Sequence, residues 1–483
     1  MWRGLLVCWV WICLFCGAGC MVGPDYQRPQ TMVQDIDQFQ WMPALWNDTR
    51  DPQGLQRWWD DFNDPVMSML VNRALMQNTD LRAAVAGVQE AEALLAQARG
   101  GRWFSVDYSG QGSRSRTGFD ASFLPDGGFM SFYSTSYNHG LNVSYALDLF
   151  GRLRRNERAA LNDLMASEAT RQALVQTVVA QVILARMTVS IQQQLLAVAD
   201  GTVQNWTQAV DLIQERYDGG LGSPLDVYFA KQSLETALAQ RSELQQGLVI
   251  ALHALDVLCG QRPGATASLA PSMGQLPSLQ RVPIGLPAWL LDRRPDVRAA
   301  EYRLRAATER IGVSMAARFP DLSLMAGLGF NSNQYNDLLT WKYRSLSVGG
   351  QIAAPIFQGG ALKAGVRASE AAARQAAETY CGVVLTAMRE VEDALVAEKK
   401  IRERIGHLHE LVTLAVEAEK LARERYHQGA DPMLNVLETE RIRRQAENSL
   451  IQAQGQLWQT RVNLMLALGG DWLEAGAANE TSL

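Results

Sequence analysis

Residues 216–227 read Arg-Tyr-Asp-Gly-Gly-Leu-Gly-Ser-Pro-Leu-Asp-Val, and residues 425–436 read Arg-Tyr-His-Gln-Gly-Ala-Asp-Pro-Met-Leu-Asn-Val. Arg, Tyr, Gly, Leu and Val recur between these two stretches at a constant offset of 209 residues. Similarity at a fixed offset is typical of a repeated structural module. We therefore expect the chain to be built from two copies of one unit.

A second match, at an offset of 216 residues, supports the duplication independently: residues 81–84 and 102–103 resemble residues 297–300 and 318–319. The predicted organisation is a signal peptide at 1–19, an N-terminal segment at 20–64, repeat 1 at 65–260, a proline-rich connector at 261–287, repeat 2 at 288–469 and a tail at 470–483.

Long helices are predicted on the N-terminal side of both matched stretches. Apolar residues recur every three or four positions over residues 175–217 and again over residues 380–426. Alternating steps of three and four indicate a coiled-coil seam. If the helices cover residues 152–217 and 361–426, each is about 100 Å long at 1.5 Å per residue.

The matched stretches themselves are predicted to be turns between antiparallel helices. We expect Gly219, Gly220 and Gly429 to supply the positive φ angles that favour such a reversal. After each turn, helical sequence continues to about Leu258 in the first copy and Leu468 in the second. Each copy is thus expected to contain one long helical hairpin.

Each copy also contains a pair of predicted strands, preceded in the first copy by a helix over about residues 65–98. Apolar and polar residues alternate in four segments, at residues 104–109, 139–148, 321–330 and 345–352. Strict alternation indicates strands with one apolar face, and we expect residues 113–136 to form an exposed loop between the first two. Strands of about ten residues are long enough to cross a membrane when tilted.

The number of strands has a consequence for assembly. A sheet in lipid must close on itself, because lipid cannot satisfy its edges, and the smallest such barrels have eight strands. One chain supplies four, so the subunits must share a barrel. Dimers would give eight strands and a filled interior, whereas trimers would give twelve strands with room for a channel.

The N-terminus is predicted to be a lipoprotein signal. Arg3 precedes eleven apolar residues, Leu5 to Phe15, which are too few to cross a bilayer as a helix. The following Gly17-Ala18-Gly19-Cys20 resembles a lipobox, so we expect a covalent lipid on Cys20. Cys259 and Cys381 are predicted to be structural thiols in helices.

Other functional classes find no support in the sequence. The net charge of −5 implies no nucleic-acid partner. The only close pair among the five histidines, His407 and His409, is two apart on a predicted helix, where side chains diverge. No P-loop, dinucleotide or nucleophile motif is present. We therefore expect no enzyme activity, no metal and no cofactor other than the covalent lipid.

Six motifs, in order, resemble those of TolC-like outer-membrane efflux proteins of the NodT/OprM lipoprotein subgroup. They are Cys20 to Tyr26 (CMVGPDY), Trp58 to Pro65 (WWDDFNDP), Leu147 to Arg152 (LDLFGR), Arg293 to Glu301 (RRPDVRAAE), Pro355 to Gly360 (PIFQGG) and Leu468 to Gly470 (LGG).

This resemblance implies an α+β membrane protein. Its expected form is a homotrimer with a shared 12-strand β-barrel, four strands per chain, continuous with a long periplasmic α-helical barrel. The chain would be the outlet of a tripartite exporter, with a periplasmic adaptor, an inner-membrane pump of the resistance-nodulation-division (RND) type and outer-membrane lipid as partners. Its cargo would be small toxic compounds such as drugs.

The same resemblance places the periplasmic gate at the two helical turns. Leu434 and Glu438 match family positions for a hydrophobic ring and an acidic ring, and the alternative for Glu438 is an ordinary exposed charge. Asp226 matches an acidic tip position, although Asn435 stands at the equivalent place in the second copy. The predicted gate residues are Asp226, Leu434, Glu438, Tyr217, Tyr426, Arg216 and Arg425, and the predicted adaptor contacts are Gly220, Leu221, Gly429 and Ala430.

Some alternatives stay open. The two tyrosines and two arginines in the gate set could latch neighbouring helices, or the tyrosines could cap the apolar seam while the arginines are solvated. A type I protein-secretion outlet or a metal-ion efflux outlet would use the same architecture. A structural lipoprotein that spans the periplasm as a coiled coil would not need the four amphipathic strands.

Overall fold

The structure is a computed structural model, and it describes residues 21–29, 40, 59, 64–120, 129–265 and 293–470. The predicted signal peptide, Cys20, most of the connector and the tail from residue 471 lie outside these residues. The chain divides into two units. The sheet unit comprises residues 1–29, 88–167 and 300–380, and the hairpin unit comprises residues 30–87, 168–299 and 381–483.

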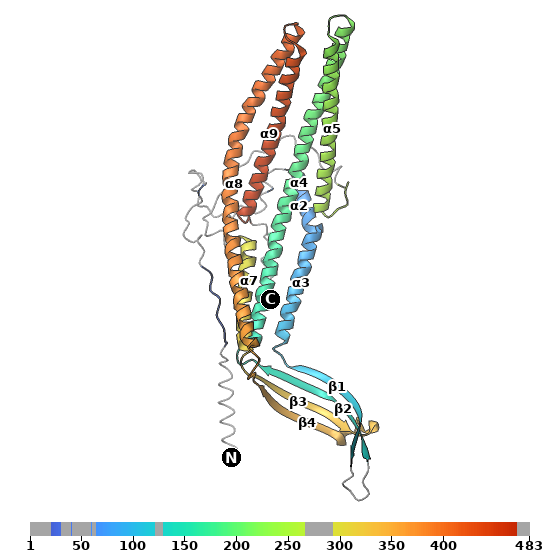
Figure 1. Cartoon of the computed structure of the whole chain (residues 1–483), viewed down its shortest axis with the longest axis vertical. Helices are drawn as coiled ribbons and strands as arrows, with labels where there is room; N and C mark the ends of the chain where they lie inside the picture. The colour runs from blue at the N-terminus through green and yellow to red at the C-terminus, as the bar shows by residue number, and fades with distance from the viewer. Residues whose placement is uncertain are drawn as a thin grey trace. The chain divides into compact units, whose positions relative to one another are not determined.

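Four antiparallel strands form one sheet in the sheet unit, in the order β1-β2-β3-β4 (Figure 1). Their bounds are Ser105–Asp120 for β1, Phe129–Leu147 for β2, Asp321–Ser332 for β3 and Arg344–Ala353 for β4. Strands β2 and β3 pair over eleven positions, so the two copies join within the sheet. Strands β1 and β4 are therefore its edges.

The register of the sheet separates apolar from polar side chains. One row across the four strands is Val106, Val143, Ala326 and Val348, and the next row on the same face is Tyr108, Leu141, Leu328 and Leu346. The row between them, Asp107, Asn142, Gly327 and Ser347, points to the other face. One face thus suits lipid and the other suits water.

The first two strands are longer than predicted, and the expected loop at residues 113–136 is wrong. Pairing of β1 with β2 continues to Asp120 and Phe129, and only residues 121–128 between them are not described. Backbone pairing does not require an apolar face. In this outer part, side chains instead interact across the pair, with Arg114 5.2 Å from the ring centroid of Tyr133.

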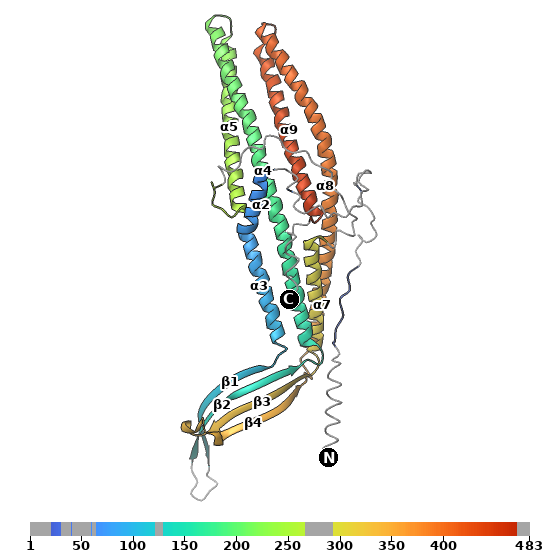
Figure 2. The same ribbon diagram turned by 180° about the vertical axis from the view of Figure 1, so that it is seen from behind.

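The long helices agree with prediction to within a residue. Helices α4 (Arg152–Asp218) and α8 (Ala361–His427) each have 67 residues, and the returning helices α5 (Pro224–Leu258) and α9 (Met433–Ala467) each have 35. In both views, α4 runs beside α5 and α8 beside α9 (Figures 1 and 2). Within the described residues, α4 alone has an apolar stretch long enough to cross a membrane, and half of that stretch is buried.

The apolar seams predicted on the long helices are covered by neighbouring chain. Seam positions that are buried include Val178, Val182, Val189, Trp206 and Ile213 in α4 and Val384, Ala387, Val391, Ala415 and Ala422 in α8. Burying a side chain as large as Val or Ile contributes about 1.5–3 kcal/mol to the stability of the fold.

The single helix predicted over residues 65–98 is interrupted at Asn78. The structure has α2 (Pro65–Gln77) and α3 (Thr79–Gly100), and Asn78 between them has an extended ψ of 130°. Its Oδ1 accepts hydrogen bonds from the backbone N–H groups of Asp80 and Leu81, as an N-cap does. Its Nδ2 donates to the carbonyl of Leu258, so tertiary contact selects the break. The described residues also form α7 (Pro295–Ala316) and two short 3₁₀ turns, η3 (Tyr335–Asp337) and η4 (Trp341–Tyr343).

Candidate functional site at the turns of the helical hairpins

The turn between α4 and α5 closes with a Schellman motif. The N–H of Leu221 donates to the carbonyl of Arg216 at 2.8 Å, and the N–H of Gly220 donates to that of Tyr217 at 2.9 Å. Gly220 has a φ of +71°. This left-handed residue followed by a long-range bond is the arrangement that satisfies the last carbonyls of a helix.

The turn between α8 and α9 repeats this motif at the offset of 209. Ala430 donates to Arg425 and Gly429 donates to Tyr426, both at 2.9 Å, and φ of Gly429 is +72°. The expectation for Gly219 is wrong, because Gly219 is not among the positive-φ glycines and its equivalent is Gln428. The predicted adaptor contacts thus occupy the same two positions in each turn.

The two turns differ in how the following helix starts. In the first, Ser223 caps α5 by accepting a hydrogen bond from the N–H of Leu225 at 3.2 Å. In the second, Pro432 offers no side-chain cap, and Arg425 donates to both carboxylate oxygens of Asp431, at 2.7 and 3.3 Å. The second turn is therefore closed by an ion pair within itself.

Three predicted gate residues meet across the two hairpins. Arg216 of α4 lies over the ring of Tyr426 of α8, with 5.4 Å between the guanidinium carbon and the ring centroid. The carboxylate of Asp226 on α5 lies near enough to Tyr426 for its charge to act on the tyrosine hydroxyl. Burial raises the pKa of Tyr426, the Asp226 charge raises it further, and Arg216 opposes the rise. We call Arg216, Asp226 and Tyr426 the tip cluster.

The other predicted gate residues lie outside the tip cluster. Tyr217 is half exposed, and Arg425 is engaged with Asp431. Leu434 is 61% exposed. Glu438 pairs with Arg441 one turn further along α9, at 2.6 and 3.0 Å, and this hydrogen bond lowers the pKa of Glu438. Within one chain, Leu434 and Glu438 therefore face away from the packed helices.

An apolar core lies beneath the turns and joins all four helices. Its buried members are Trp206 and Ile213 from α4, Val227, Ala230 and Ala237 from α5, Ala422 from α8, and Met433 and Val436 from α9, with Tyr426 packed against them. Tyr426 therefore connects this core to the tip cluster.

Buried carboxylates near this core were not predicted as functional residues. Glu440 of α9 is 1% exposed and accepts a hydrogen bond from Nε1 of Trp206 at 2.8 Å, with Arg444 3.2 Å away. Burial raises the pKa of Glu440 despite the Arg444 charge. The sequence gives no signal for Glu440, since it lies outside the apolar stripes.

Two further buried carboxylates, Glu398 and Glu419, lie at positions of the α8 stripe. Glu398 pairs with Arg461 of α9, with Nε of Arg461 at 3.0 Å, and Glu419 pairs with Arg443 of α9. Each also bonds an arginine one turn along α8. The second hairpin is thus held by ion pairs at positions where its seam is not apolar.

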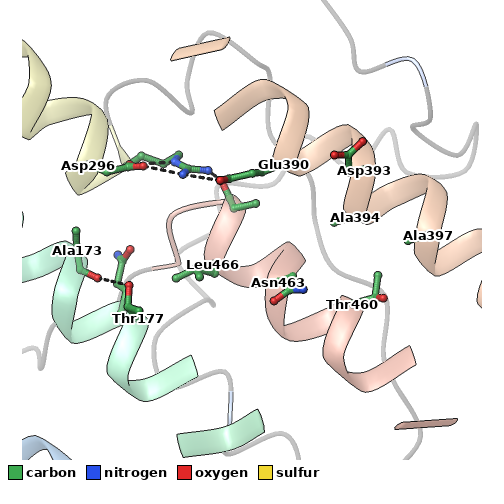
Figure 3. A pocket seen from close by; sticks show the side chains of 13 residues that line it. Ala173, Thr177, Asp296, Glu390, Asp393, Ala394, Ala397, Thr460, Asn463 and Leu466 are labelled. Carbon is green, nitrogen blue, oxygen red and sulfur yellow. Dashed lines mark hydrogen bonds and ion pairs between the residues drawn. The ribbon is translucent and has the colours of Figure 1, made fainter. Parts of the chain in front are cut away.

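A pocket of about 590 Å³ lies in the hairpin unit between α4, α8, α9 and the start of α7 (Figure 3). Arg294 crosses it, donating to Asp296 at 2.7 Å, to Glu390 at 2.7 Å and to the carbonyl of Ala467 at 3.1 Å. This explains the second arginine of the Arg293-Arg294-Pro295-Asp296 motif as a tie between three helices. Among the described residues, no group of His, Cys, Asp and Glu could hold a metal ion.

Residues 21–29, here called the N-terminal strap, are held against the sheet unit. The N–H of Val22 donates to the carbonyl of Phe150 at 3.2 Å. The fully buried Arg155 donates to Glu309 at 2.9 Å and to Asp25 of the strap at 3.1 Å. The strap therefore begins beside the end of β2.

A four-stranded sheet with one lipid-compatible face and two free edges, on a chain with paired helical hairpins, defines a channel protein of the outer membrane whose barrel is shared between chains. The family model of outer membrane efflux proteins matches residues 70–261 and 286–470. The chain belongs to this family, and its place in the outer membrane follows.

Individual relatives agree over nearly the whole chain. A toluene efflux pump outer membrane protein, TtgC of Pseudomonas putida, is 33% identical, with 96% of this chain and 95% of that protein covered. The antibiotic efflux pump outer membrane protein ArpC of Pseudomonas putida matches to the same extent. The solved outer-membrane channel OprN superposes with a TM-score of 0.85 at 31% identity, covering 94% of this chain and all of that one.

These similarities confirm the predicted fold class and function. The chain has the fold of trimeric outer-membrane channels that combine a β-barrel, four strands per chain, with an α-helical barrel. It is the outer-membrane channel component of an efflux pump, in a family of transport channels.

Proposed function

We propose that this chain is the gated outlet of a tripartite efflux system of the RND type and that it passes small, largely apolar toxic compounds. The observation that carries the gate is the tip cluster, which ties the two hairpins of one chain together at their turns. The cargo class rests on the relatives named for toluene and antibiotic efflux.

Opening requires the two hairpins to separate at their turns. Separation breaks the contact of Arg216 with Tyr426 and moves Tyr426 away from Asp226, while the apolar core beneath resists larger movement. A cation over an aromatic ring contributes about 0.5–2 kcal/mol. Three copies of the tip cluster, one per protomer, thus favour the closed state by an amount that a docked partner can overcome.

The exposed residues of α9 form the constriction. On a three-fold axis, Leu434 and Glu438 each become a ring of three side chains. Three carboxylates about 6 Å apart repel by roughly 3 kcal/mol per pair at an effective dielectric of 20. Arg441, paired with Glu438 in each chain, offsets this repulsion, so the ring tolerates closure and still attracts cations.

The two Schellman turns are the docking points for a periplasmic adaptor. Gly220 and Leu221 present the same backbone shape as Gly429 and Ala430, because both turns have the same hydrogen bonds and the same left-handed glycine. One kind of adaptor surface can therefore bind both turns. Leu221 is 77% exposed and adds an apolar anchor to the first.

The N-terminal strap supports lipidation of Cys20, the residue before it. Met21 lies against Gly151, so closely that a Cβ added to Gly151 would be 2.5 Å from Cγ of Met21. Gly151 follows the end of β2 by four residues. Acyl chains on Cys20 would therefore enter the bilayer beside the strands that cross it, each buried methylene contributing about 0.8 kcal/mol.

Three measurements test this function. A strain that lacks the gene is expected to become sensitive to apolar solvents and antibiotics, and the adaptor and pump are expected to co-purify with the tagged chain. A double variant, Asp226→Ala with Glu438→Ala, is expected to conduct cations in planar bilayers more often than the closed wild-type trimer. Unchanged conductance in assembled trimers would refute the gate, and export of a polypeptide with unchanged drug sensitivity would favour a protein-secretion outlet.

A further inference from the structure

The two copies meet in an aromatic stack at the helix end of the sheet. The rings of Phe150 and Phe319 lie 4.6 Å apart between centroids, with 20° between their planes. Phe150 follows the end of β2, the last strand of the first copy, and Phe319 precedes β3, the first strand of the second. This stack lies at the corner where β2 of the first copy is beside β3 of the second.

Trp103 is the counterpart of Phe319 in the first copy. The N–H of Trp103 donates to Gly100 at 3.0 Å, and that of Phe319 donates to Ala316 at 3.0 Å, so both bonds match at the offset of 216. Trp103 lies two residues before β1 begins, as Phe319 does before β3. The same local turn therefore presents both rings.

Phe357 is likewise the counterpart of Phe150 in the second copy. Leu149-Phe150 and Ile356-Phe357 each follow the last strand of their copy and precede a 67-residue helix. Left-handed glycines lie between ring and helix in both, Gly151 with φ +77° in the first copy and Gly359 and Gly360 with φ +56° and +85° in the second. The second connection is longer, but both connections place an aromatic ring between the last strand and the long helix.

Exposure distinguishes the two rings that stack within the chain from their counterparts at the edges of the sheet. Phe319 is 40% exposed and Phe150 is half-buried, whereas Trp103 is 73%, Phe357 86% and Ile356 93% exposed. Trp103 belongs to the β1 edge of the sheet and Phe357 to the β4 edge, and these are the edges that must pair between protomers in a shared barrel.

We propose that Phe357 of one protomer stacks on Trp103 of the next, so that a second copy of this chain completes at each protomer seam the stack that Phe150 and Phe319 make within the chain. The inference rests on the shared barrel and adds to it the residues that close the seam. Antiparallel pairing of β4 with β1 of the next protomer, as β2 pairs with β3, brings the two corners to the same end of the sheet. Aromatic pairs favour such stacking geometry beyond their burial alone.

Cysteine cross-linking tests the contact. In a Cys381→Ser background, where Cys259 is fully buried, the pair Trp103→Cys and Phe357→Cys is treated with a short thiol-to-thiol reagent. Dimer and trimer bands on a denaturing gel are expected. The matched pair Phe150→Cys and Phe319→Cys is expected to link within one chain and stay at monomer mass. Trp103→Cys with Phe319→Cys, two rings that both precede a strand, is expected to give no link.

Light scattering before cross-linking separates failure of this inference from failure of the trimer. The aromatic contact would be overturned if trimers gave no inter-chain bands while the Phe150 and Phe319 control pair was linked. Trp103 and Phe357 would then contact lipid instead of each other. A wild-type protein that is monomeric would overturn the shared barrel as well.

As a second readout, Phe357→Ala is expected to lower the temperature at which trimers dissociate in detergent. Leu339→Ala, at a similarly exposed residue between β3 and β4, is expected not to lower it.

Discussion

Arg216 and Tyr426 stack across the two helical hairpins, with 5.4 Å from guanidinium carbon to ring centroid. They occupy adjacent positions of the same repeated Arg-Tyr pair, Arg216 from the first copy and Tyr426 from the second. Their partners, Tyr217 and Arg425, do not reproduce the contact, because Arg425 is bound by Asp431 whereas the equivalent residue in the first turn is Gly222. One acid in one turn thus makes a symmetric repeat asymmetric, and the described residues contain a single contact of this kind.

Removing one hydroxyl is expected to weaken the proposed latch without removing the ring. Tyr426→Phe keeps the contact with Arg216 and removes the polar group near Asp226, which we expect to cost the closed state about 0.5–1.5 kcal/mol per protomer. We expect the open fraction of reconstituted trimers to rise by about tenfold or more, measured as open probability in single-channel recordings. Tyr217→Phe, a similar change on a half-exposed ring, is the control and should behave as wild type. Equal conductance of both variants would contradict the latch.

The buried Glu440 is expected to lower the stability of the protein as pH rises. Burial raises the pKa of Glu440 above its ordinary 4.5. The stability linked to this group is fully present below about pH 4.5 and is lost as pH rises through the raised pKa. Glu440→Gln, which still accepts from Trp206, removes the cost of burying the ion. We expect the melting temperature of this variant, relative to wild type, to be higher at pH 8 than at pH 5, and the reverse order would disprove the assignment.

Glu398 is expected to give the opposite pH dependence of stability. Burial acts to raise the pKa of Glu398, but the hydrogen bonds and charges of Arg461 and Arg402 lower it overall. Its stabilisation is present above about pH 4.5 and is lost as pH falls through the lowered pKa. Glu398→Gln leaves Arg461, which is 3% exposed, without its counter-charge, at a cost of about 3–5 kcal/mol. Thermal melts should show a large deficit at pH 7 that shrinks towards pH 4; a deficit independent of pH would contradict the ion pair.

The features that the sequence predicts well are those that repeat over long distances. Steps of three and four over some forty residues defined α4 and α8 to within one residue, and alternation defined the part of each strand where one face is apolar. Where β1 and β2 extend beyond that part, polar and aromatic residues are mixed on both faces and the period disappears, although the backbone ladder continues.

The failures have a common physical origin in tertiary contact. Asn78 ends a helix because Leu258, distant in sequence, accepts its amide. Glu440 is buried where Trp206 of the other hairpin donates a hydrogen bond to it. Of the predicted gate set, the contact of Arg216 with Tyr426 depends on how two hairpins pack, which no local pattern encodes, and Leu434 and Glu438 remain predictions about neighbouring protomers.

Glycine substitutions in the two turns test whether adaptor docking depends on the backbone shape of the turns or on the space left for side chains. Gly220 and Gly429 have φ near +70°, and nothing lies within 4 Å of where a Cβ would be added. Alanine at either position therefore meets no clash but must adopt a left-handed backbone, at a cost of roughly 1–2 kcal/mol. Gly219→Ala is the matched control, because Gly219 does not have a positive φ and its equivalent is already Gln428. We expect Gly220→Ala and Gly429→Ala to loosen the turns and lower the amount of adaptor that co-purifies, while Gly219→Ala retains it and all three form trimers. If Gly219→Ala lost the adaptor equally, the docking surface would depend on side-chain space and not on the shape of the turn.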